Sequence, residues 1–424
     1  MVILLGFGPG DGGSTPLGTI QITFFMRIFM ENLLLIGINT RSMLNSALKL
    51  NYNIFSTSYF STSDTPKIKN QKIILEEKKN ESSGIFEDNF NSKTILDISK
   101  EYIDEVDYII PISGVSPSDF SKKDQKKILG SKNVIDIEDK FKFYRKIQDK
   151  FKTPETFLIK DIDEAIEISK NKPNVKYILK PLKGSGGYNI NLLNNDSYLQ
   201  LNDNENFILQ EYISGINLSS SILGTKDTKK TIMNSRLLTE NDFKNNNRFI
   251  YIGNILPLTN ESILRKVKDI NKINNNLIET SQKLAYEFDL IGSNGIDYIL
   301  NENGLYVIEI NPRIQGTFEC IEKSLQINML DAHIKSCLNE EYEIPKAKYY
   351  TYKKIIYSPL RTKYSKIDLN NIYDLPHIGT ITEKSEPLLT IIDKNTNFKE
   401  LYEKVENISQ IVNQEVKKHQ QDTI

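Results

Sequence analysis

A short apolar run delivers a lysine to a glycine-rich stretch. Residues 177–179 lead into Lys180 and Pro181, and the chain continues as Lys183-Gly184-Ser185-Gly186-Gly187. Pro181 bars a helix here, so we expect a strand to carry Lys180 while Lys183 lies on the loop. Glycines let backbone N–H groups converge on phosphate oxygens, which a strand-borne lysine can also meet. The alternative is a flexible glycine-rich hairpin beside a solvated lysine.

A second segment places oxygen ligands on a predicted β-hairpin. Apolar runs at 295–300 and 305–311 flank an Asn-Glu-Asn-Gly turn signal. Side chains alternate along a strand, so Glu309 and Asn311 should share one face while Ile308 faces the other. Hard oxygen ligands on one face suit Mg²⁺ with bound phosphate.

Asp297 adds a third oxygen ligand only if it pairs with Glu309. That register needs an odd number of loop residues, such as Glu302-Asn303-Gly304, and we predict this loop. Arg313 follows directly and could neutralise a transferred phosphoryl group. The alternative is a structural ion pair between Glu309 and Arg313. Metal binding is favoured because acidic and amide groups in an apolar run are costly to bury without a partner.

A third segment, 207–215, ends an apolar strand with Gln210-Glu211-Tyr212-Ile213 and a Ser-Gly turn. Its backbone could hydrogen-bond an adenine edge, with Ile213 packed on the ring. An ordinary strand end explains the same pattern equally well.

Bulk composition limits the classes of partner. The formal net charge is -1, so the chain has no electrostatic footprint for nucleic acid or an acidic membrane surface. No apolar run approaches the roughly 20 residues of a bilayer span. Cys320 and Cys337 fit neither a disulfide framework nor a metal-type spacing, which favours inert thiols in a reducing, cytoplasmic setting. His333 lies on a predicted helix and is expected to be structural.

Residues 1–29 differ from the rest, being rich in glycine and almost uncharged. Gly8, Gly10 and Gly13 match a dinucleotide-binding spacing, but Pro9 and Pro16 argue against it, since a helix should open there. We expect an extension foreign to the natural protein, or a disordered one, with the natural start at Met30. The intact mass of natively expressed protein tests this: a mass that includes residues 1–29 would contradict it.

Alternation of apolar runs and helical patterns predicts an α/β fold. Runs at 32–38, 53–56 and 105–112 indicate parallel strands. We predict five parts: the extension 1–29, a Rossmann-like domain at 30–130, two α+β lobes at 131–206 and 207–338, and a small β-rich cap with a helix at 339–424.

Taken in order, the segments around Lys180, Gln210, Asp297 and Glu309 resemble the ATP-grasp superfamily, over roughly residues 130–335. The chain ends are similar to a branch described as predicted ATP-dependent carboligases, through Gly37-Ile38-Asn39-Thr40-Arg41 and 374–380. Archaeal tyramine–glutamate ligases share this plan. The resemblance implies an ATP-grasp fold of two lobes that clamp ATP, preceded by the Rossmann-like domain and followed by the cap.

The resemblance also implies roles for individual residues. Lys180 would contact the α- and β-phosphates, Lys140 would lie near the α-phosphate, and the loop 184–187 would cover the γ-phosphate. The adenine pocket would be lined by Gln210, Glu211 and Ile213. The Mg²⁺ (or Mn²⁺) ligands would be Asp297, Glu309 and Asn311, and Arg313 would steady an acyl-phosphate.

One position departs from the family. Where many members carry a ribose-binding glutamate, this chain has Leu218, so Ser219 or Ser220 would have to substitute. Ligands of doubly wound sheets bind at the carboxyl ends of strands, and we therefore expect Arg41 and Ser113-Gly114 to hold the carboxylate substrate. The residues 315–317 would face the acceptor.

The implied enzyme is a carboxylate–amine ligase with Lys180 and Arg313 as catalytic residues. Its partners would be a small carboxylate and an amine, and a homo-oligomer stays open. Two alternatives remain: a bicarbonate-activating carboxylase and a non-catalytic ATP-binding regulatory protein.

Overall fold

The computed structural model of the chain describes residues 30–82, 90–182, 184, 187, 190–193, 207–240, 242 and 249–418. The chain divides into two compact units, Met1–Met30 and Glu31–Ile424, and the fold is that of the second. The predictions for residues 1–29, including the spacing of Gly8, Gly10 and Gly13, lie outside the described residues.

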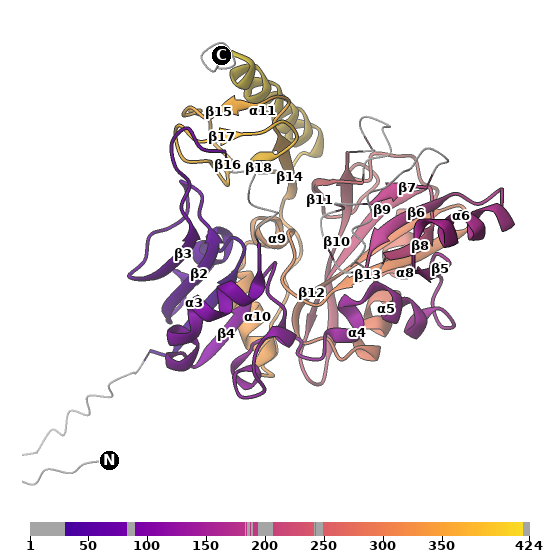
Figure 1. Cartoon of the computed structure of the whole chain (residues 1–424), viewed down its shortest axis with the longest axis horizontal. Coiled ribbons are helices and arrows are strands. Elements are labelled where there is room, and N and C mark those ends of the chain that lie inside the picture. Colours follow the sequence, from indigo (N-terminus) through magenta and orange to yellow (C-terminus); the bar gives the residue numbers. More distant parts are fainter. Residues whose placement is uncertain are drawn as a thin grey trace, which may run out of the picture. The chain divides into compact units, whose positions relative to one another are not determined.

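A four-stranded parallel sheet opens the fold, with the order β3-β2-β1-β4 (Figure 1). Its strands are β1 (Asn32–Gly37), β2 (Asn53–Phe60), β3 (Asn70–Leu75) and β4 (Tyr108–Pro111). Helix α1 (Arg41–Ala47) packs on one face and α3 (Ser92–Glu105) on the other. Strand β1 is apolar and almost wholly buried because both faces are covered. The predicted Rossmann-like parallel sheet is confirmed.

Short helices connect this sheet to a second, antiparallel one. They are η2 (Pro117–Asp119), η3 (Asp124–Lys127), α4 (Ile135–Glu138) and α5 (Lys140–Ile147). Asp139 ends α4 and caps α5, since its side chain accepts from two backbone N–H groups of the first turn. The second sheet has the order β5-β8-β6-β7 and is covered by α6 (Ile162–Asn171). Its strands are β5 (Thr156–Ile159), β6 (Tyr177–Pro181), β7 (Asn191–Leu192) and β8 (Phe207–Glu211).

An eight-stranded antiparallel sheet forms the largest layer, in the order β13-β12-β9-β10-β11-β14-β18-β16. Its strands are β9 (Ile216–Gly224), β10 (Lys229–Thr239), β11 (Tyr251–Leu256), β12 (Gly292–Asn301), β13 (Gly304–Asn311), β14 (Tyr350–Tyr357), β16 (Ile372–Tyr373) and β18 (Pro387–Asn395). Strands β15 (Thr362–Lys363) and β17 (Ile381–Thr382) pair separately. The helices packed on the large sheet are α8 (Ile270–Glu287), α9 (Phe318–Leu325), α10 (Met329–Cys337) and α11 (Phe398–Lys418).

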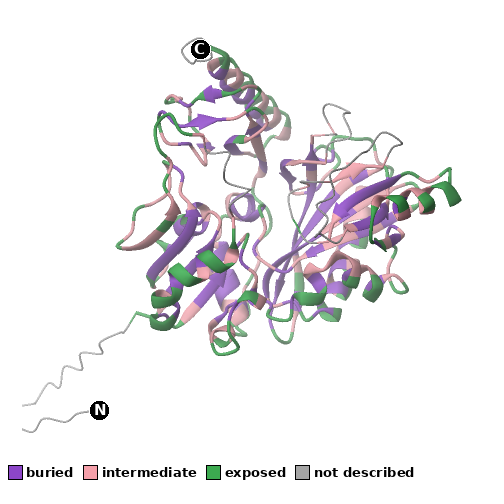
Figure 2. Cartoon of the chain, viewed as in Figure 1, coloured by how far each residue is buried: buried purple, intermediate pink, exposed green. Residues whose placement is uncertain are grey.

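Strands of the predicted cap extend the same sheet as the second predicted lobe, because β14 pairs with β11. The predicted domain boundaries stay predictions. Figure 2 shows that the strands are mostly buried while the outer faces of helices such as α3 and α6 are exposed. None of the helices among the described residues combines the length and apolar character that a bilayer span requires.

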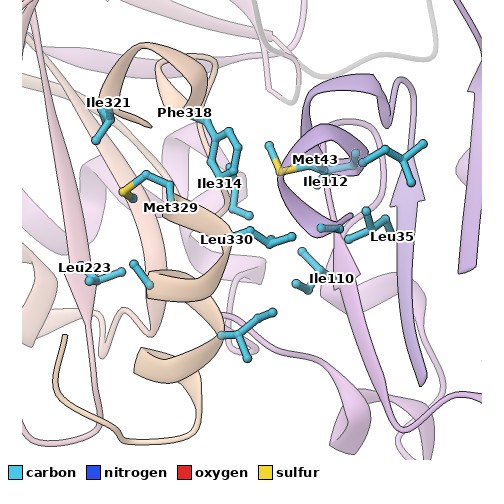
Figure 3. Close-up of a cluster of buried hydrophobic side chains, with 14 of the residues drawn as sticks. Leu35, Met43, Ile110, Ile112, Leu223, Ile314, Phe318, Ile321, Met329 and Leu330 are labelled. Atoms are coloured by element: carbon cyan, nitrogen blue, oxygen red, sulfur yellow. The ribbon is translucent and has the colours of Figure 1, made fainter. Parts of the chain in front are cut away.

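One apolar cluster joins the parallel sheet to the helices that follow β13. From the first part come Leu35, Met43 and Ile112, and from the second come Phe318 and Leu330 (Figure 3). All five side chains are buried. Burial on this scale, at roughly 25 cal/mol per Å² of apolar surface, stabilises one relative placement of the two parts. The cluster lies beside the segment that leaves β13, and so helps position the site described below.

His333 on α10 is buried and bridges two segments. Its Nδ1 accepts from the backbone N–H of Ser293 (2.8 Å), and its Nε2 lies 3.2 Å from the carbonyl oxygen of Leu129. The neutral ring with its proton on Nε2 satisfies both contacts, whereas a proton on Nδ1 would face an N–H group. Burial lowers the pKa of His333 from its usual 6.5 to about 4. The expected structural role agrees with this geometry.

We predict that His333 makes the fold less stable in mild acid. Because its folded pKa lies below its unfolded pKa, the unfolded state binds more protons between pH 6.5 and 4. The contribution of neutral His333 to the free energy of unfolding is therefore fully present above pH 6.5. It is lost as the pH falls, by about 2 kcal/mol at pH 5. Urea unfolding at pH 7.5 and 5.0, compared with His333→Gln, measures the contribution. An equal loss in both proteins would contradict it.

Candidate active site

Strands β12 and β13 are joined by a tight turn. Asn301 pairs with Gly304, which leaves Glu302 and Asn303 as a two-residue loop. The Asn301 side chain accepts from the backbone N–H of Asn303 (2.9 Å) and stabilises the turn. The predicted three-residue loop is therefore wrong.

A β-bulge supplies the odd residue that the turn does not. Tyr298 pairs with Val307, but the next pair is Asp297 with Glu309, so Ile308 is the extra residue. The predicted pairing of Asp297 with Glu309 is thus confirmed, for a different physical reason. The bulge also turns Ile308 to line the cavity of the site, so the prediction that it faces away is wrong.

Two carboxylates face each other across these strands, supported by neutral donors. Ser219 Oγ donates to Asp297 Oδ1 (2.6 Å). Asn311 Nδ2 lies 3.1 Å from Asp297 Oδ2 and 3.5 Å from Glu309 Oε1. Burial, and then the charge of Glu309, raise the pKa of Asp297 well above its usual range. A divalent cation would relieve this repulsion, and two carboxylates with an amide oxygen are donors that Mg²⁺ accepts.

Arg313 follows β13 and approaches the same group. Its Nη2 donates to Asn311 Oδ1 (3.3 Å), so the hydrogen bond goes to the amide and not to Glu309. Burial lowers the pKa of Arg313, against the raising effects of Glu309 and Asp297. The alternative of a structural ion pair between Glu309 and Arg313 therefore does not fit the observed hydrogen bond of Arg313 to Asn311.

Lys180 lies in the middle of β6 with a buried side chain. Its Nζ donates to Gln210 Oε1 (2.8 Å), and Gln210 Nε2 donates to Thr156 Oγ1 (2.9 Å). Burial lowers the pKa of Lys180 to about 8, against the charge of Glu309 and together with that of Lys140. The ammonium of Lys180 therefore lies close enough to Glu309 to interact with its charge. A lysine that contacts a phosphate beside a metal would need this position.

The glycine-rich loop is described in part. Lys140 Nζ donates to the carbonyl oxygen of Gly184 (2.8 Å), which ties α5 to the loop. Gly187 has φ +79°, and a Cβ there would lie 2.0 Å from the carbonyl oxygen of Phe249, so only glycine fits. The predicted ligands Lys183, Ser185 and Gly186 lie outside the described residues.

A cavity of about 590 Å³ collects the predicted residues. Residues of both antiparallel sheets line it, together with residues such as Asn39 and Ser113, which follow β1 and β4. Its lining includes Lys140, Lys180, Gly184, Gly187, Gln210, Glu211, Ile213, Asp297, Glu309, Asn311 and Arg313. The structure therefore brings together the predicted nucleotide-binding and metal-binding residues that it describes.

Of the two serines predicted to substitute for the missing ribose-binding glutamate, Ser219 lines the cavity and Ser220 does not. Leu218 is wholly buried in the apolar core under β9, and Ser220 is buried against Asn234. Because side chains alternate along β9, Asn217 and Ser219 are the residues that line the cavity. Asn217 was not predicted as a site residue from the sequence. Its position between the apolar residues Ile216 and Leu218 on a strand could have shown that its side chain points away from the core.

Residues after β13 form the far side of the cavity. Gln315 Oε1 accepts from Ser221 Oγ (3.0 Å), and Gln315 Nε2 lies 3.3 Å from Ser219 Oγ. A Cβ on Gly295 would lie 1.4 Å from Gln315 Nε2, so a side chain at this position would displace Gln315 from the wall. Gly316 and Thr317 complete this neutral, polar wall.

Arg41 does not bind substrate, contrary to the prediction. It is 1% exposed, and its guanidinium contacts both oxygens of Glu319 (2.8 and 2.7 Å) and Asp374 Oδ1 (2.7 Å). Burial alone would lower the pKa of Arg41, but Asp374 and Glu319 raise it above its usual value. Arg41 therefore links α1 to α9 and to the C-terminal part through ion pairs. The residues of this region that line the cavity are Asn39, Ser42 and Ser113.

We predict that Arg41→Met destabilises the fold by about 3–5 kcal/mol, because it leaves buried carboxylates without a partner. Urea unfolding measures this difference. The double variant Arg41→Met with Glu319→Met should recover much of the loss, since it removes both charges. A single-variant loss below about 1 kcal/mol would show that the network is dispensable.

Comparison with known proteins agrees with this geometry. A family model described as an ATP-grasp domain matches residues 137–317. An uncharacterized protein of Methanocaldococcus jannaschii is 31% identical over 90% of each chain. The tyramine–L-glutamate ligase of the same organism is 30% identical over 48% of this chain and 51% of its own length, so the chain spans about half of that relative.

A solved structure shows the same fold. N5-carboxyaminoimidazole ribonucleotide synthetase from Thermotoga maritima has a TM-score of 0.65 at 15% identity, covering 90% of this chain and 98% of that one. The fold and the relatives define the class as ATP-grasp ligases, which are enzymes. The chain belongs to the ATP-grasp family.

Proposed function

We propose that the protein uses ATP and Mg²⁺ to activate a carboxylate for attack by an amine. The observation that carries this proposal is the facing pair Asp297 and Glu309, with Lys180 and Arg313 on the same cavity. A lysine and an arginine around a metal-type carboxylate pair provide the charge that phosphoryl transfer requires. The name of the tyramine–L-glutamate ligase, which joins an amine and an amino acid, supports an amine as acceptor.

The proposed reaction has two steps. A carboxylate oxygen of the substrate attacks the γ-phosphorus of ATP, and the bond from that phosphorus to ADP breaks. The amine nitrogen then attacks the acyl carbon, the bond to phosphate breaks, and the amine loses a proton. The second step yields an amide and inorganic phosphate.

The chain's own residues would position and neutralise these groups. Lys180, fixed by Gln210, would hold the phosphates nearest β6, and Arg313 would face the oxygens that gain charge during transfer. Asp297, Glu309 and Asn311 would hold Mg²⁺ or Mn²⁺, which supplies charge neutralisation between phosphate oxygens when bound. No side-chain nucleophile is required.

The remaining cavity lining divides between the nucleotide and the second substrate. Glu211 and Ile213 would meet the adenine, and Asn217 takes the place proposed for ribose recognition. The wall of Gln315 and Thr317 would face the substrate pair. This wall is neutral and polar, which suits the orientation of a carboxylate by hydrogen bonds.

We predict that Glu309→Ala lowers Mg-dependent ADP release on the order of 100-fold or more, because one of two carboxylate ligands is lost. The assay uses the full chain with MgATP and pooled amino acids, amines and small acids, with mass spectrometry of the product. Glu302→Ala is the matched control, since Glu302 is exposed in the turn of the same hairpin. It should behave as the unmodified protein.

The outcomes separate the candidate functions. Unchanged turnover in Glu309→Ala would remove the metal assignment. ADP release that depends on bicarbonate alone would replace the ligase with a carboxylase. Tight ATP binding without turnover under every mixture would make the protein a regulatory ATP binder.

A further inference from the structure

Lys353 stands on the cavity face of the large sheet. On β14 its neighbours Tyr352 and Lys354 reach Glu406 of α11, at 2.9 and 2.7 Å. Because side chains alternate, Lys353 points to the opposite face. There it pairs across the strands with Asn254, which lines the cavity.

The environment of Lys353 changes along that face. Thr351, two residues earlier, is wholly buried under α9 and its hydroxyl lies 3.3 Å from the carbonyl oxygen of Cys320. Lys353 is half-buried, at the place where the loop around Gly316 leads into the first turn of α9. Strand β14 therefore passes from the covered Thr351 to the half-buried Lys353, whose cross-strand partner Asn254 lines the cavity.

The Lys353 ammonium retains unused donors. Its Nζ donates to the carbonyl oxygen of Gly316 (3.0 Å). Within the described ranges it forms no ion pair, in contrast to Lys354, which pairs with Glu406 (2.7 Å). The carboxylate of Asp374 acts on it from farther away and is bonded to Arg41. An ammonium has three N–H donors, so a half-buried one with a single carbonyl partner favours a further anionic partner.

The Lys353 ammonium lies close to residues that line the cavity. A Cβ added to Gly316 would lie 3.5 Å from Tyr251 Oη and 3.9 Å from Lys353 Nζ, both ordinary contact distances. The hydroxyl and the ammonium thus both lie near the bare Cα of Gly316, and the hydroxyl donates to Asn254 Oδ1, so the ammonium is the group with donors to spare. Gly316, Tyr251 and Asn254 all line the cavity.

Other cations that line the cavity have their own partners. Lys140 is bonded to the glycine-rich loop, Lys180 to β8 and Arg313 to the amide oxygen of Asn311, while Arg265 lies 4.0 Å from Asp242. Lys353 comes from another strand, outside the matched ATP-grasp range 137–317. Because Lys353 lies apart from the cations near the proposed phosphate positions, we infer that it binds a different anion from the nucleotide phosphates.

We propose that Lys353, held at the edge of the cavity by the carbonyl oxygen of Gly316, forms a subsite for a second carboxylate of the substrate that is activated. The proposal rests on the proposed ligase function, and it narrows the substrate class to acids with two carboxylates. One carboxylate enters the phosphoryl-transfer site near Arg313, and the other pairs with Lys353. A charge-assisted hydrogen bond of this kind is stronger than a neutral one and selects an anion.

The test compares acids that differ by one carboxylate, using the full chain, MgATP and pooled amines. Glutarate is paired with butyrate, and L-glutamate with 4-aminobutyrate. We expect ADP release with a kcat/KM on the order of tenfold or more higher for the diacids. Lys353→Met should raise the KM for the diacid by a similar factor while the KM for ATP stays within about twofold, and Lys353→Arg should restore part of the preference.

Lys346→Met is the matched control, because Lys346 is exposed and the substitution removes the same charge. It should leave the diacid preference unchanged. Equal turnover of diacid and monoacid by the unmodified protein, or equal KM values with and without Lys353→Met, would overturn the subsite.

A binding measurement separates this proposal from the ligase function. Thermal unfolding is followed with MgADP and added glutarate or butyrate. If no acid supports ADP release but glutarate alone raises Tm, and Lys353→Met abolishes that rise, the subsite stands and the ligase proposal fails. If neither acid raises Tm and none supports ADP release, both proposals fail.

Discussion

Antiparallel strands β12 and β13 hold the carboxylates of Asp297 and Glu309 opposite each other inside a cavity. Burial raises the pKa of Asp297 above its usual range, and repulsion from the charge of Glu309 raises it further. The surrounding groups reduce this repulsion. Ser219 and Asn311 donate to the pair, and the lysine of β6 adds positive charge nearby. We propose that a divalent cation binds between the carboxylates and that a nucleotide binds in the cavity around it.

Part of this site could be predicted from local sequence alone. The alternation that puts Glu309 and Asn311 on one face needs only a strand, and Pro181 is enough to show that Lys180 is not on a helix. The pairing of Asp297 with Glu309 was predicted correctly from a wrong loop. A turn of two residues and a bulge at Ile308 give the same pairing as a loop of three residues. Sequence shows the number of residues between two strands, but not which of them is bulged.

The remainder depends on contacts between distant segments. Arg41 follows a strand as a ligand-binding residue would, yet its partner Glu319 lies 278 positions away and nothing local indicates the pair. Strands β10 and β11 carry buried polar residues such as Ser235 and Asn254, which bond to each other across the sheet. Because these polar residues interrupt the apolar runs, strands β10 and β11 were not predicted from the sequence. Lys353 gives the same lesson, because only strand pairing places it beside the cavity.

Anomalous diffraction from crystals grown with Mn²⁺ and ADP tests the central claim most directly. The account predicts a manganese peak between the carboxylates of Asp297 and Glu309, with phosphate oxygens of the nucleotide on its other side and Lys180 contacting the same phosphates. Nucleotide density in the cavity without a manganese peak at this pair, or a peak at another place in the chain, would contradict it.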